Sequence, residues 1–566
     1  MASPTLHEQQ GLRIAVEGCG HGVLHEIYAS VAKACELKGW PDVDLLIIGG
    51  DFQVCSCVAT LSACLTPQAV RNASDLKAVS MPSKYYAMHD FHEYYAGTRV
   101  APYLTIFIGG NHEASNYMWE LYYGGWAAPR IYYMGAANVV RLGPLRIAGL
   151  SGIWKGYNYK KPHFERLPYN SDDVRSIYHV RELDVRKLLQ IRTQVDVGLS
   201  HDWPRSMEWK GNHRQLFKFK PDFEQEAKDG TLGSIAATTV LERLRPPYWF
   251  SAHMHTKFSA VWEHADAQTR TENDADPFPI AVINEGEIDL DIADETPAAA
   301  PKNDAEIDLE MDDEELPQTT APTSNDATQP NSTNGSSAVP QDIRDLLPES
   351  FARPKVEKVQ TLPFPTDITN KTTNFLALDK CLPKRHFLQL LEITPHAPAD
   401  LQRPLQLHYD KEWLAITRVF ARDLQVGDPH AHVPSDKGDA FYRPLVEKEM
   451  DWVEENIAKA GKMAIPEDFA LTAPVYDPSL GIHTHEEPQE YSNPHTQSFC
   501  DLLQIRNAFH ASDEERAQLM HTGPRAVQQR HDRGGNRGGY RGRGGGHSRG
   551  GGGRGRGRGG RGRGRW

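Results

Sequence analysis

The sequence is poor in cysteine and in long apolar runs. Its seven cysteines, few and widely spaced in 566 residues, are Cys19, Cys35, Cys55, Cys57, Cys64, Cys381 and Cys500. An odd, scattered set does not fit a disulfide framework, so we expect a reducing compartment. No run approaches 18 apolar residues, and residues 1–13 lack the apolar core of a secretory signal. We therefore expect a soluble protein of the nucleus or cytoplasm, with no membrane partner.

Acidic residues are missing from the end of the chain. Residues 533–566 carry eleven arginines and no Asp or Glu; since the whole chain has a formal net charge of −13, the rest sums to −24. Arginines in RGG repeats attract RNA phosphates without reading sequence. We predict a disordered, RNA-binding RGG tail over residues 519–566. A tail that serves only solubility or localisation is the alternative.

Apolar residues are scarce again between residues 264 and 370. Residues 285–315 hold fourteen acidic side chains and one lysine, and residues 317–340 are mostly Thr, Ser, Asn, Pro and Ala. Such a segment cannot bury enough apolar surface to offset its chain entropy. We predict a disordered acidic linker over residues 264–370.

Short apolar, β-branched runs recur in the first half of the chain, with helical patterns such as Leu24–Lys38 and Val185–Arg192 between them. The expected strands are Ile14–Val16, Val43–Ile48, Tyr103–Ile108, Leu145–Leu150, Val195–Leu199 and Tyr248–Ser251. Alternating strands and helices predict an α/β sheet whose loops meet at one edge. After the linker, order resumes with a strand at Phe375–Leu378, which we expect to pair beside a strand at Lys257–Trp262.

Five of the expected strands end in side chains that bind metals. The motifs are GCGH, GGDFQ, GGNHE, LSHDWP and SAHMH, and they supply Cys19, His21, Asp51, Asn111, His112, His201, His253 and His255. A two-metal hydrolase needs ligands for two cations roughly 3.5–4 Å apart, with one carboxylate able to bridge them. We assign Cys19, His21 and His255 to one metal and Asn111, His201 and His253 to the other. Asp51 would bind both.

Each motif alone is a weak signal. A histidine after a strand is usually solvated or hydrogen-bonded, and Gly-Asp and Gly-Asn pairs are usually turns. Five such motifs in succession, each directly after an apolar strand, favour the metal centre instead.

The order of these motifs resembles the calcineurin-like metallophosphoesterase family, whose pattern is D-x-H, G-D, G-N-H-(D/E), H and G-H-x-H. Two departures resemble the lariat-debranching branch of that family: Cys19 replaces Asp, and Ser251-Ala252 precede the last histidine pair where Gly is usual. Longer segments are similar to that branch as well, among them YGGWAAPRIYYMG, SGIWKGYNYKKPHFERLPYN, SHDWPRS and FLALDKCLPKRHFLQLLEI. The likeness covers residues 12–263 and 373–510.

The resemblance implies an α/β fold: a two-sheet sandwich flanked by helices in a catalytic domain (residues 12–263), with a C-terminal debranching-enzyme domain (residues 371–518) and disordered segments. It implies two divalent metals, Fe(II), Zn(II) or Mn(II), and hydrolysis of the 2′–5′ bond of branched (lariat) RNA in the nucleus, with shuttling to the cytoplasm left open. His112 would be the general acid, while Glu113 would orient it or lie outside the ligands. Spliceosome or intron-turnover factors would be further partners.

The resemblance also identifies residues 151–181 as a lariat recognition loop. Its candidate substrate-binding residues are Lys155, Tyr157, Tyr159, Lys160, Lys161, His163, Phe164, Arg166 and Tyr169. Aromatic side chains among cations suit single-stranded RNA, because bases stack and phosphates need counter-charge. Without the resemblance, a solvated basic loop is the other interpretation. A generic metal-dependent nuclease or phosphatase, and an inactive RNA-binding scaffold, remain alternatives for the whole chain.

Residues 54–68 interrupt the resemblance. The related enzymes run from the GDFQ motif directly into a segment like AVRNASDLK, whereas here fifteen uncharged residues with three cysteines intervene. Val54 is encoded by a codon that begins with GT, and Gln68 is compatible with CAG. A translated, unspliced intron and a genuine loop over the metal site are the two hypotheses.

Overall fold

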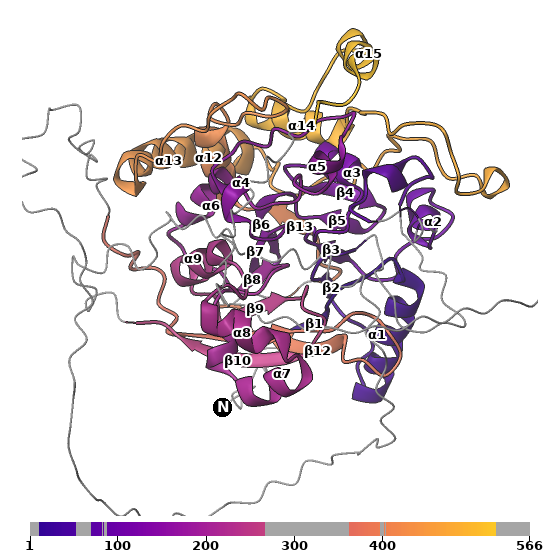
Figure 1. Cartoon of the computed structure of the whole chain (residues 1–566). Coiled ribbons are helices and arrows are strands. Elements are labelled where there is room, and N and C mark those ends of the chain that lie inside the picture. The colour runs from indigo at the N-terminus through magenta and orange to yellow at the C-terminus, as the bar shows by residue number, and fades with distance from the viewer. Residues whose placement is uncertain are drawn as a thin grey trace, which may run out of the picture. The chain divides into compact units, whose positions relative to one another are not determined.

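Two β-sheets lie at the centre of the computed structural model (Figure 1). The structure describes residues 11–52, 70–81, 83, 86, 88–265, 362–396, 401 and 403–527. The predicted insert, most of the predicted linker and most of the predicted tail lie outside these residues.

The first sheet has six strands and the second has seven. In spatial order the first contains β12 (Leu388–Ile393), β1 (Leu12–Glu17), β2 (Leu45–Ile48), β3 (Thr105–Phe107), β5 (Ile131–Tyr133) and β4 (Gly125–Ala128). The second contains β10 (Phe258–Glu263), β11 (Thr372–Ala377), β9 (Tyr248–Ser251), β8 (Val197–Ser200), β7 (Leu145–Leu150), β6 (Ala137–Leu142) and β13 (Leu407–Tyr409).

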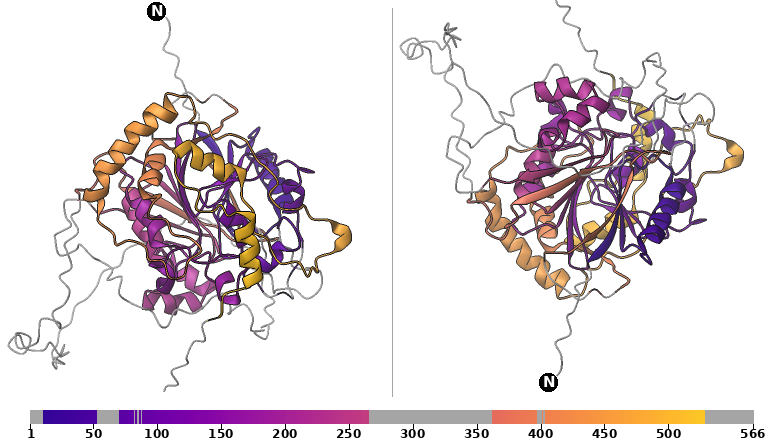
Figure 2. Two further views of the ribbon diagram at one scale, coloured as in Figure 1. Left: turned by 90° about the horizontal axis from the view of Figure 1, so that it is seen from above. Right: turned by 90° about the horizontal axis from the view of Figure 1, so that it is seen from below.

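Helices lie on both sides of the paired sheets, and the views in Figure 2 show α1 and the α6–α9 group on opposite sides. The helices are α1 (Leu24–Lys38), α2 (Phe91–Tyr95), α3 (Ser115–Glu120), α4 (Gly156–Tyr159), α5 (Ser171–Val174), α6 (Glu182–Leu189), α7 (His213–Phe219), α8 (Asp222–Asp229), α9 (Ile235–Leu244), α12 (Lys411–Phe420), α13 (Asp439–Val453), α14 (Pro494–Leu503) and α15 (Asp513–Thr522). Short turns of helix add η1 (Asp75–Ala78), η3 (Met207–Lys210), η6 (Glu454–Ala458) and η7 (Pro478–Leu480).

Strands β2 to β5 of the first sheet are buried along their whole length, which explains their largely apolar sequences. Ile14 and Val16 of β1 enter the larger apolar cluster, which also contains residues of the second sheet, α6, α9 and α12. Ala15, on the opposite face of β1, enters a second cluster with Leu24 and Val31 of α1. The successive residues of one strand therefore serve two cores.

The chain beyond the linker completes both sheets. β11 pairs with β10 in antiparallel register, from Phe258 opposite Ala377 to Glu263 opposite Thr372, and it runs parallel to β9. This confirms the expected pairing of Phe375–Leu378 beside the strand after His255. β12 then pairs with β1, and β13 with β6. The linker is therefore an insertion between neighbouring strands, and the C-terminal region shares its sheets with the catalytic region.

Several strands begin or end one to three residues from their predicted bounds, and three further boundaries differ from the prediction. Residues 362–370, predicted as the end of the linker, pack on the domain: Arg192 donates to the Pro363 carbonyl, and the Arg245 guanidinium lies 4.1 Å from the Phe364 ring. α15 runs to Thr522, past residue 518, which is the predicted end of the C-terminal domain; a capping box stabilises the start of this helix. α6 spans Glu182–Leu189 rather than Val185–Arg192, since acidic residues occupy its first turn.

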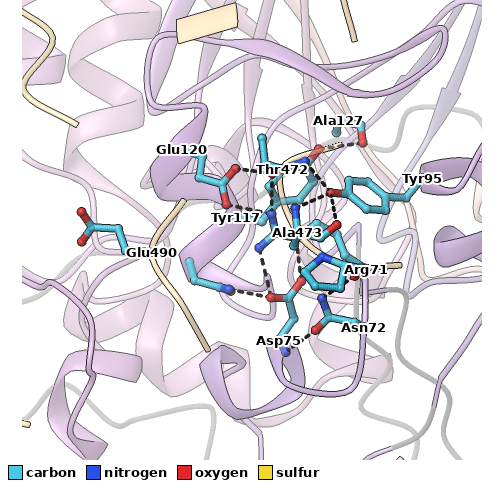
Figure 3. A network of polar contacts seen from close by, with 12 residues as sticks. Arg71, Asn72, Asp75, Tyr95, Tyr117, Glu120, Ala127, Thr472, Ala473 and Glu490 are labelled. Atoms are coloured by element: carbon cyan, nitrogen blue, oxygen red, sulfur yellow. Dashed lines mark hydrogen bonds and ion pairs between the residues drawn. The ribbon is translucent and has the colours of Figure 1, made fainter. Parts of the chain in front are cut away.

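A buried polar network joins two distant parts of the chain (Figure 3). Arg71 Nε and Nη1 donate to Asp75 and Glu120, each at 2.7 Å, and all three side chains are at most 2% exposed. Thr472 accepts from Arg71 at 2.9 Å and donates to Glu120 at 2.6 Å. The Tyr117 ring lies 4.0 Å from the Arg71 guanidinium. This network fixes the C-terminal segment beside the turn that follows residue 70.

Candidate active site

The five motifs meet where strands of both sheets end. The first three follow β1, β2 and β3, which are parallel neighbours in the first sheet, and the last two follow β8 and β9, parallel neighbours in the second. The carboxyl ends of parallel strands lie at one edge of a sheet, and residues as far apart in the sequence as Cys19 and His253, 234 positions, therefore meet here.

The predicted ligands form two groups that share one carboxylate. One ligand atom from each of Cys19, His21, Asp51 and His255 lies within 4.8 Å of the others. The same limit encloses one atom from each of Asp51, His201 and His253. Asp51 thus belongs to both groups, as the sequence predicts for a bridging carboxylate.

The first group brings together atoms that carry lone pairs. Nε2 of His21 and Nε2 of His255 lie 3.2 Å apart. The Cys19 sulfur accepts the backbone N–H of His253 at 3.2 Å. A thiolate and two imidazoles beside a carboxylate suit a borderline or soft cation such as Zn²⁺ or Fe²⁺.

The second group is oriented by backbone contacts. Nδ1 of His201 donates to the Gly49 carbonyl at 2.8 Å, so Nε2 is the nitrogen that faces Asp51, 3.4 Å from its Oδ1. Asn111 is buried here, and its backbone N–H donates to Asp51 at 3.0 Å. A histidine whose second nitrogen is fixed in this way is a typical metal ligand.

Four of the predicted ligands have a left-handed backbone. His21, Asp51, His253 and His255 have φ of 45°, 46°, 63° and 47°. This region is unfavourable for residues other than glycine, and such strain concentrates at functional sites. The surrounding structure therefore holds these side chains in positions that the local sequence alone would not adopt.

Two motif glycines are required by close packing. A Cβ on Gly50 would lie 2.3 Å from His201 Nδ1, and a Cβ on Gly110 would lie 2.1 Å from Asp51 Oδ1. The glycines of the GGD and GGN motifs thus allow the turns to approach the ligands.

Burial and neighbouring charges shift the pKa values of the candidate ligands. Burial and nearby His201 lower the pKa of His253 to about 3, and burial with His21 lowers the pKa of His255 well below its ordinary value. Both imidazoles are therefore neutral. Burial would raise the pKa of Asp51, but His201 and His112 hold it well below its usual range. Burial, Asp51 and Glu17 raise the pKa of Cys19, so metal binding there displaces a proton.

His112, the predicted acid, lies beside this centre. Its backbone N–H donates to Asp51 at 3.1 Å, and its Nδ1 lies 3.0 Å from the Ser80 carbonyl oxygen. The hydroxyl of Ser80 lies 3.2 Å from that of Tyr178 in the recognition loop. Sequence reasoning missed this link to residue 80, because no motif marks that segment.

Glu113 holds two motifs together. One of its oxygens accepts the backbone N–H groups of Phe52 (2.9 Å) and Gly110 (3.0 Å). Burial and Asp51 raise its pKa to about 7. These contacts favour the second of the two roles expected for Glu113: it lies outside the metal ligands and supports the turns that carry them.

The chain after the linker also reaches the centre. The Asp379 carbonyl accepts the Cys19 N–H, and the Cys19 carbonyl accepts the Cys381 N–H. A Cβ on Gly18 would lie 2.2 Å from the Asp379 carbonyl oxygen. The sequence shows that this segment resembles the lariat-debranching branch of the family. It does not show that the segment lies against the first group of ligands.

The nine candidate residues of the recognition loop divide by environment. Tyr157, Lys160 and Lys161 are exposed, whereas Lys155 is buried. Tyr159 packs on Trp154, and the Phe164 ring has the Lys161 ammonium 5.6 Å from its centre.

Two further candidates form ion pairs within the protein. His163 Nε2 lies 2.7 Å from Asp184, and Arg166 makes two contacts of 2.8 Å with Glu490. Tyr169 is half-buried. The sequence could not distinguish side chains that hold the loop from those that project from it.

A pocket lies between the GGNHE turn and this loop. Its lining includes Gly110 and Glu113 on the metal side and Tyr178, His179 and Arg181 on the loop side. The predicted substrate-binding loop and the predicted metal centre are therefore adjacent.

Two groups of ligands with a shared carboxylate, at the edge of two sheets flanked by helices, define a metal-dependent phosphoesterase. In agreement, the family model described as calcineurin-like phosphoesterase matches residues 12–257, and the model described as the C-terminal domain of lariat debranching enzyme matches residues 370–508.

Full-length relatives are similar to nearly the whole chain. The lariat debranching enzyme of Schizosaccharomyces pombe is 38% identical over 499 residues, which cover 88% of this chain and 96% of the relative. The human enzyme is 37% identical over 496 residues (87% and 69%), and the Arabidopsis thaliana enzyme 35% over 492 residues (87% and 86%). The chain belongs to the lariat debranching enzyme family. None of the helices that the structure describes is long and apolar enough to cross a membrane.

Proposed function

We propose that this enzyme hydrolyses the 2′–5′ phosphodiester bond at the branch point of excised intron lariats and so linearises introns for turnover. The observation that carries the proposal is the position of the recognition loop directly beside a two-group metal centre that contains Cys19. The products are a linear intron and a free 2′ hydroxyl.

The donor set fits two divalent cations. Cys19, His21 and His255 would hold one cation and His201 and His253 the other, with Asp51 shared by both. Asn111, whose backbone N–H donates to Asp51, would complete the second site. When bound, two such cations supply charge neutralisation for the phosphate oxygens and lower the pKa of water to give the nucleophile.

His112 would act on the leaving group. Because Nδ1 donates to the Ser80 carbonyl, Nε2 is the nitrogen available to the departing 2′ oxygen. A protonated imidazole there would give its proton as the bond breaks, which makes His112 a general acid.

The recognition loop would bind the RNA around the branch. The exposed ring of Tyr157 offers a stacking surface, and the ammonium groups of Lys160 and Lys161 offer counter-charge to phosphates. His163 and Arg166 would keep the loop in place through Asp184 and Glu490.

The metals proposed are Fe(II), Zn(II) or Mn(II). A thiolate in place of a carboxylate softens the first site, so Zn(II) or Fe(II) would be preferred there, with Mn(II) able to support activity and Mg(II) a poor substitute. The second site, with amide and carboxylate oxygen, would be less selective.

The experiment compares substrates. Purified enzyme is incubated with a synthetic branched RNA, the linear RNA of the same sequence, single-stranded DNA and a phosphopeptide. We expect cleavage of the branched RNA alone. Cleavage of DNA or the phosphopeptide at similar rates would favour a generic nuclease or phosphatase, and binding without cleavage an inactive scaffold.

We propose a nuclear location, where excised lariats arise, with spliceosome or intron-turnover factors as partners. Fractionation or imaging of the tagged full chain tests the location, and a purely cytoplasmic signal would contradict it.

A further inference from the structure

An exposed group of aromatic rings lies on the segment that joins β8 to α8. Trp209, in η3, is 42% exposed, and Phe219, the last residue of α7, is 67% exposed. The Trp209 ring centre lies 5.2 Å from that of His213 and 5.5 Å from that of Phe217. Exposed aromatic rings that gather within one segment mark a binding surface more often than isolated ones do.

The same segment is basic, although the chain as a whole is acidic. Residues 209–221 hold three lysines, one arginine and one histidine and no Asp or Glu, whereas the whole chain has a formal net charge of −13. The acid just before them, Glu208, is 2% exposed, and burial raises its pKa to about 7. The segment therefore presents positive charge, which suits an anionic partner.

Two of the cations lie on the face of α7 that points to solvent. Arg214 and Lys218 are one helical turn apart and both exposed, whereas Leu216 is 3% exposed and belongs to the larger apolar core. Neither cation forms an ion pair with any residue that the structure describes, although Lys228 of α8 pairs with Glu224. Both charges are thus available to an anionic ligand.

Close packing holds this segment on the edge strand of the second sheet. Gly211 forms an antiparallel bridge with Ala260 of β10, and a Cβ on Gly211 would lie 2.4 Å from the Ser259 carbonyl oxygen. The Lys210 ammonium lies 5.0 Å from the centre of the Trp262 ring of the same strand. The rings and cations are therefore carried by a fixed part of the fold, which favours their use as a binding surface.

That edge strand begins close to the candidate metal centre. Ala260 is five residues after His255, and five residues of extended chain span at most about 18 Å. Phe258, at the start of β10, stacks on Trp203 with 5.1 Å between ring centres, and Trp203 follows His201 by two residues. The segment is thus joined to two of the turns that supply ligands, within reach of an RNA arm that leaves the branch.

We propose that Trp209, Arg214, Lys218 and Phe219, which we call the α7 surface, bind a single-stranded arm of the RNA outside the branch. The inference rests on the proposed function, because it takes the RNA to be branched. Bases stack on exposed aromatic rings whatever their sequence, and nearby cations neutralise the phosphates. An acidic peptide would match the charge, but a nucleic acid also offers a flat base with each charge.

The test varies the length of the RNA arms. Synthetic branched RNAs carry arms of about two or about fifteen nucleotides, so that only the longer arms span a site of roughly 4–16 nucleotides. With the metal-loaded full chain, Trp209→Ala and Phe219→Ala should each raise KM about tenfold for the long-armed RNA, the scale for losing one stacked base. KM for the short-armed RNA should stay within about twofold, and the turnover number should not change for either RNA.

The salt dependence tests the cations separately. Arg214→Gln and Lys218→Gln together should lower the slope of log KM against log salt by about 1.4 for the long-armed RNA, because each cation on a single strand contributes about 0.7. Lys448→Gln with Lys462→Gln, at exposed positions, is the control and should leave the slope unchanged. Phe441→Ala is the control for the rings, because Phe441 is also 42% exposed.

Three outcomes would overturn the proposal. Equal rises of KM for short and long arms would mean that these side chains only support the fold, and an unchanged KM for long arms would exclude RNA from the α7 surface. Weaker binding of polyglutamate by the same variants, with KM unchanged, would assign the surface to an acidic protein segment. Phe219→Ala keeps the test valid if Trp209→Ala fails to fold, because the Phe219 ring is the more exposed of the two.

The proposed function can fail separately. If neither branched RNA were cleaved, the debranching activity would be wrong. Binding of a fluorescent linear RNA would then still measure the α7 surface, and the variants would weaken that binding if the surface holds a single strand. The two failures are therefore distinguishable.

Discussion

Nδ1 of His112 lies 3.0 Å from the backbone carbonyl oxygen of Ser80. A carbonyl oxygen only accepts, so Nδ1 carries a proton and the tautomer of the neutral ring is fixed. Ser80 in turn contacts Tyr178, 3.2 Å between the hydroxyl oxygens. A contact between the RNA and the recognition loop can therefore influence the orientation of His112.

His112→Ala should lower the turnover number roughly 100-fold, the usual scale for loss of a positioned general acid. Metal content should stay near that of the wild type, because His112 contributes only its backbone N–H to Asp51. Single-turnover cleavage of branched RNA and elemental analysis measure the two quantities. His430→Ala, at an exposed position, is the matched control. Full turnover in the alanine variant would show that another group protonates the 2′ oxygen.

Much of this site could be predicted because the motifs follow apolar strands. The strand at Tyr248–Ser251 and the helix at Leu24–Lys38 have the predicted bounds, and Cys19 and His255 meet as expected. What local patterns could not show are contacts between segments far apart in sequence. Ser80 has no motif of its own, and its role depends on the tertiary position of a turn. The sequence predicts His163 and Arg166 as RNA-binding residues. Their partners in the fold, Asp184 and Glu490, lie elsewhere in the chain, and no local pattern reveals these ion pairs.

The shared ligand predicts a difference between two metal-site variants. Asp51→Ala should lose both cations, because Asp51 belongs to both ligand groups. Cys19→Ser should weaken only the first site and shift its preference away from Zn(II) and Fe(II), since a hydroxyl is a harder ligand than a thiolate. Elemental analysis after dialysis, with activity measured on re-addition of Zn, Fe, Mn or Mg, distinguishes them. Equal activity of the wild type with Mg and with the other metals would contradict the soft first site.

The network around Arg71 predicts a large loss of stability (Figure 3). Arg71→Met keeps an unbranched apolar side chain but leaves Asp75 and Glu120 buried without their cation. Removing one partner of a buried ion pair costs about 3–5 kcal/mol in the free energy of unfolding. Denaturant unfolding measures this cost.

Lys33→Met provides the control for Arg71. It breaks the exposed ion pair with Glu36, in which nitrogen and oxygen are 2.8 Å apart, close to the 2.7 Å of the two Arg71 pairs. The substitution should change the free energy of unfolding by less than about 1 kcal/mol. Similar losses for the two variants would show that burial of the Arg71 network is not what makes it important.

The origin of residues 54–68 gives the last prediction. Both ends of the region are anchored independently: Phe52 is fully buried and stacks on Phe107 with 4.0 Å between ring centres, and Val70 and Arg71 are fully buried as well. If residues 54–68 are a translated intron, the fold does not depend on them. Deletion of all fifteen should then leave metal content and turnover within about twofold of the full chain. The shorter loop should also raise the free energy of unfolding by roughly 1–2 kcal/mol, because closing a loop costs entropy that grows with its length.

The transcript distinguishes the two hypotheses directly. An intron requires mature messages that lack 45 nucleotides, three for each residue, with GT and AG at the ends of the removed segment. Uniform retention across growth conditions, without those ends, would exclude the intron. If the deletion variant also lost turnover while keeping its metals, the segment would be a genuine loop that acts on the substrate beside Asp51. The charge-free sequence and its three cysteines would then need a functional explanation at the metal centre itself.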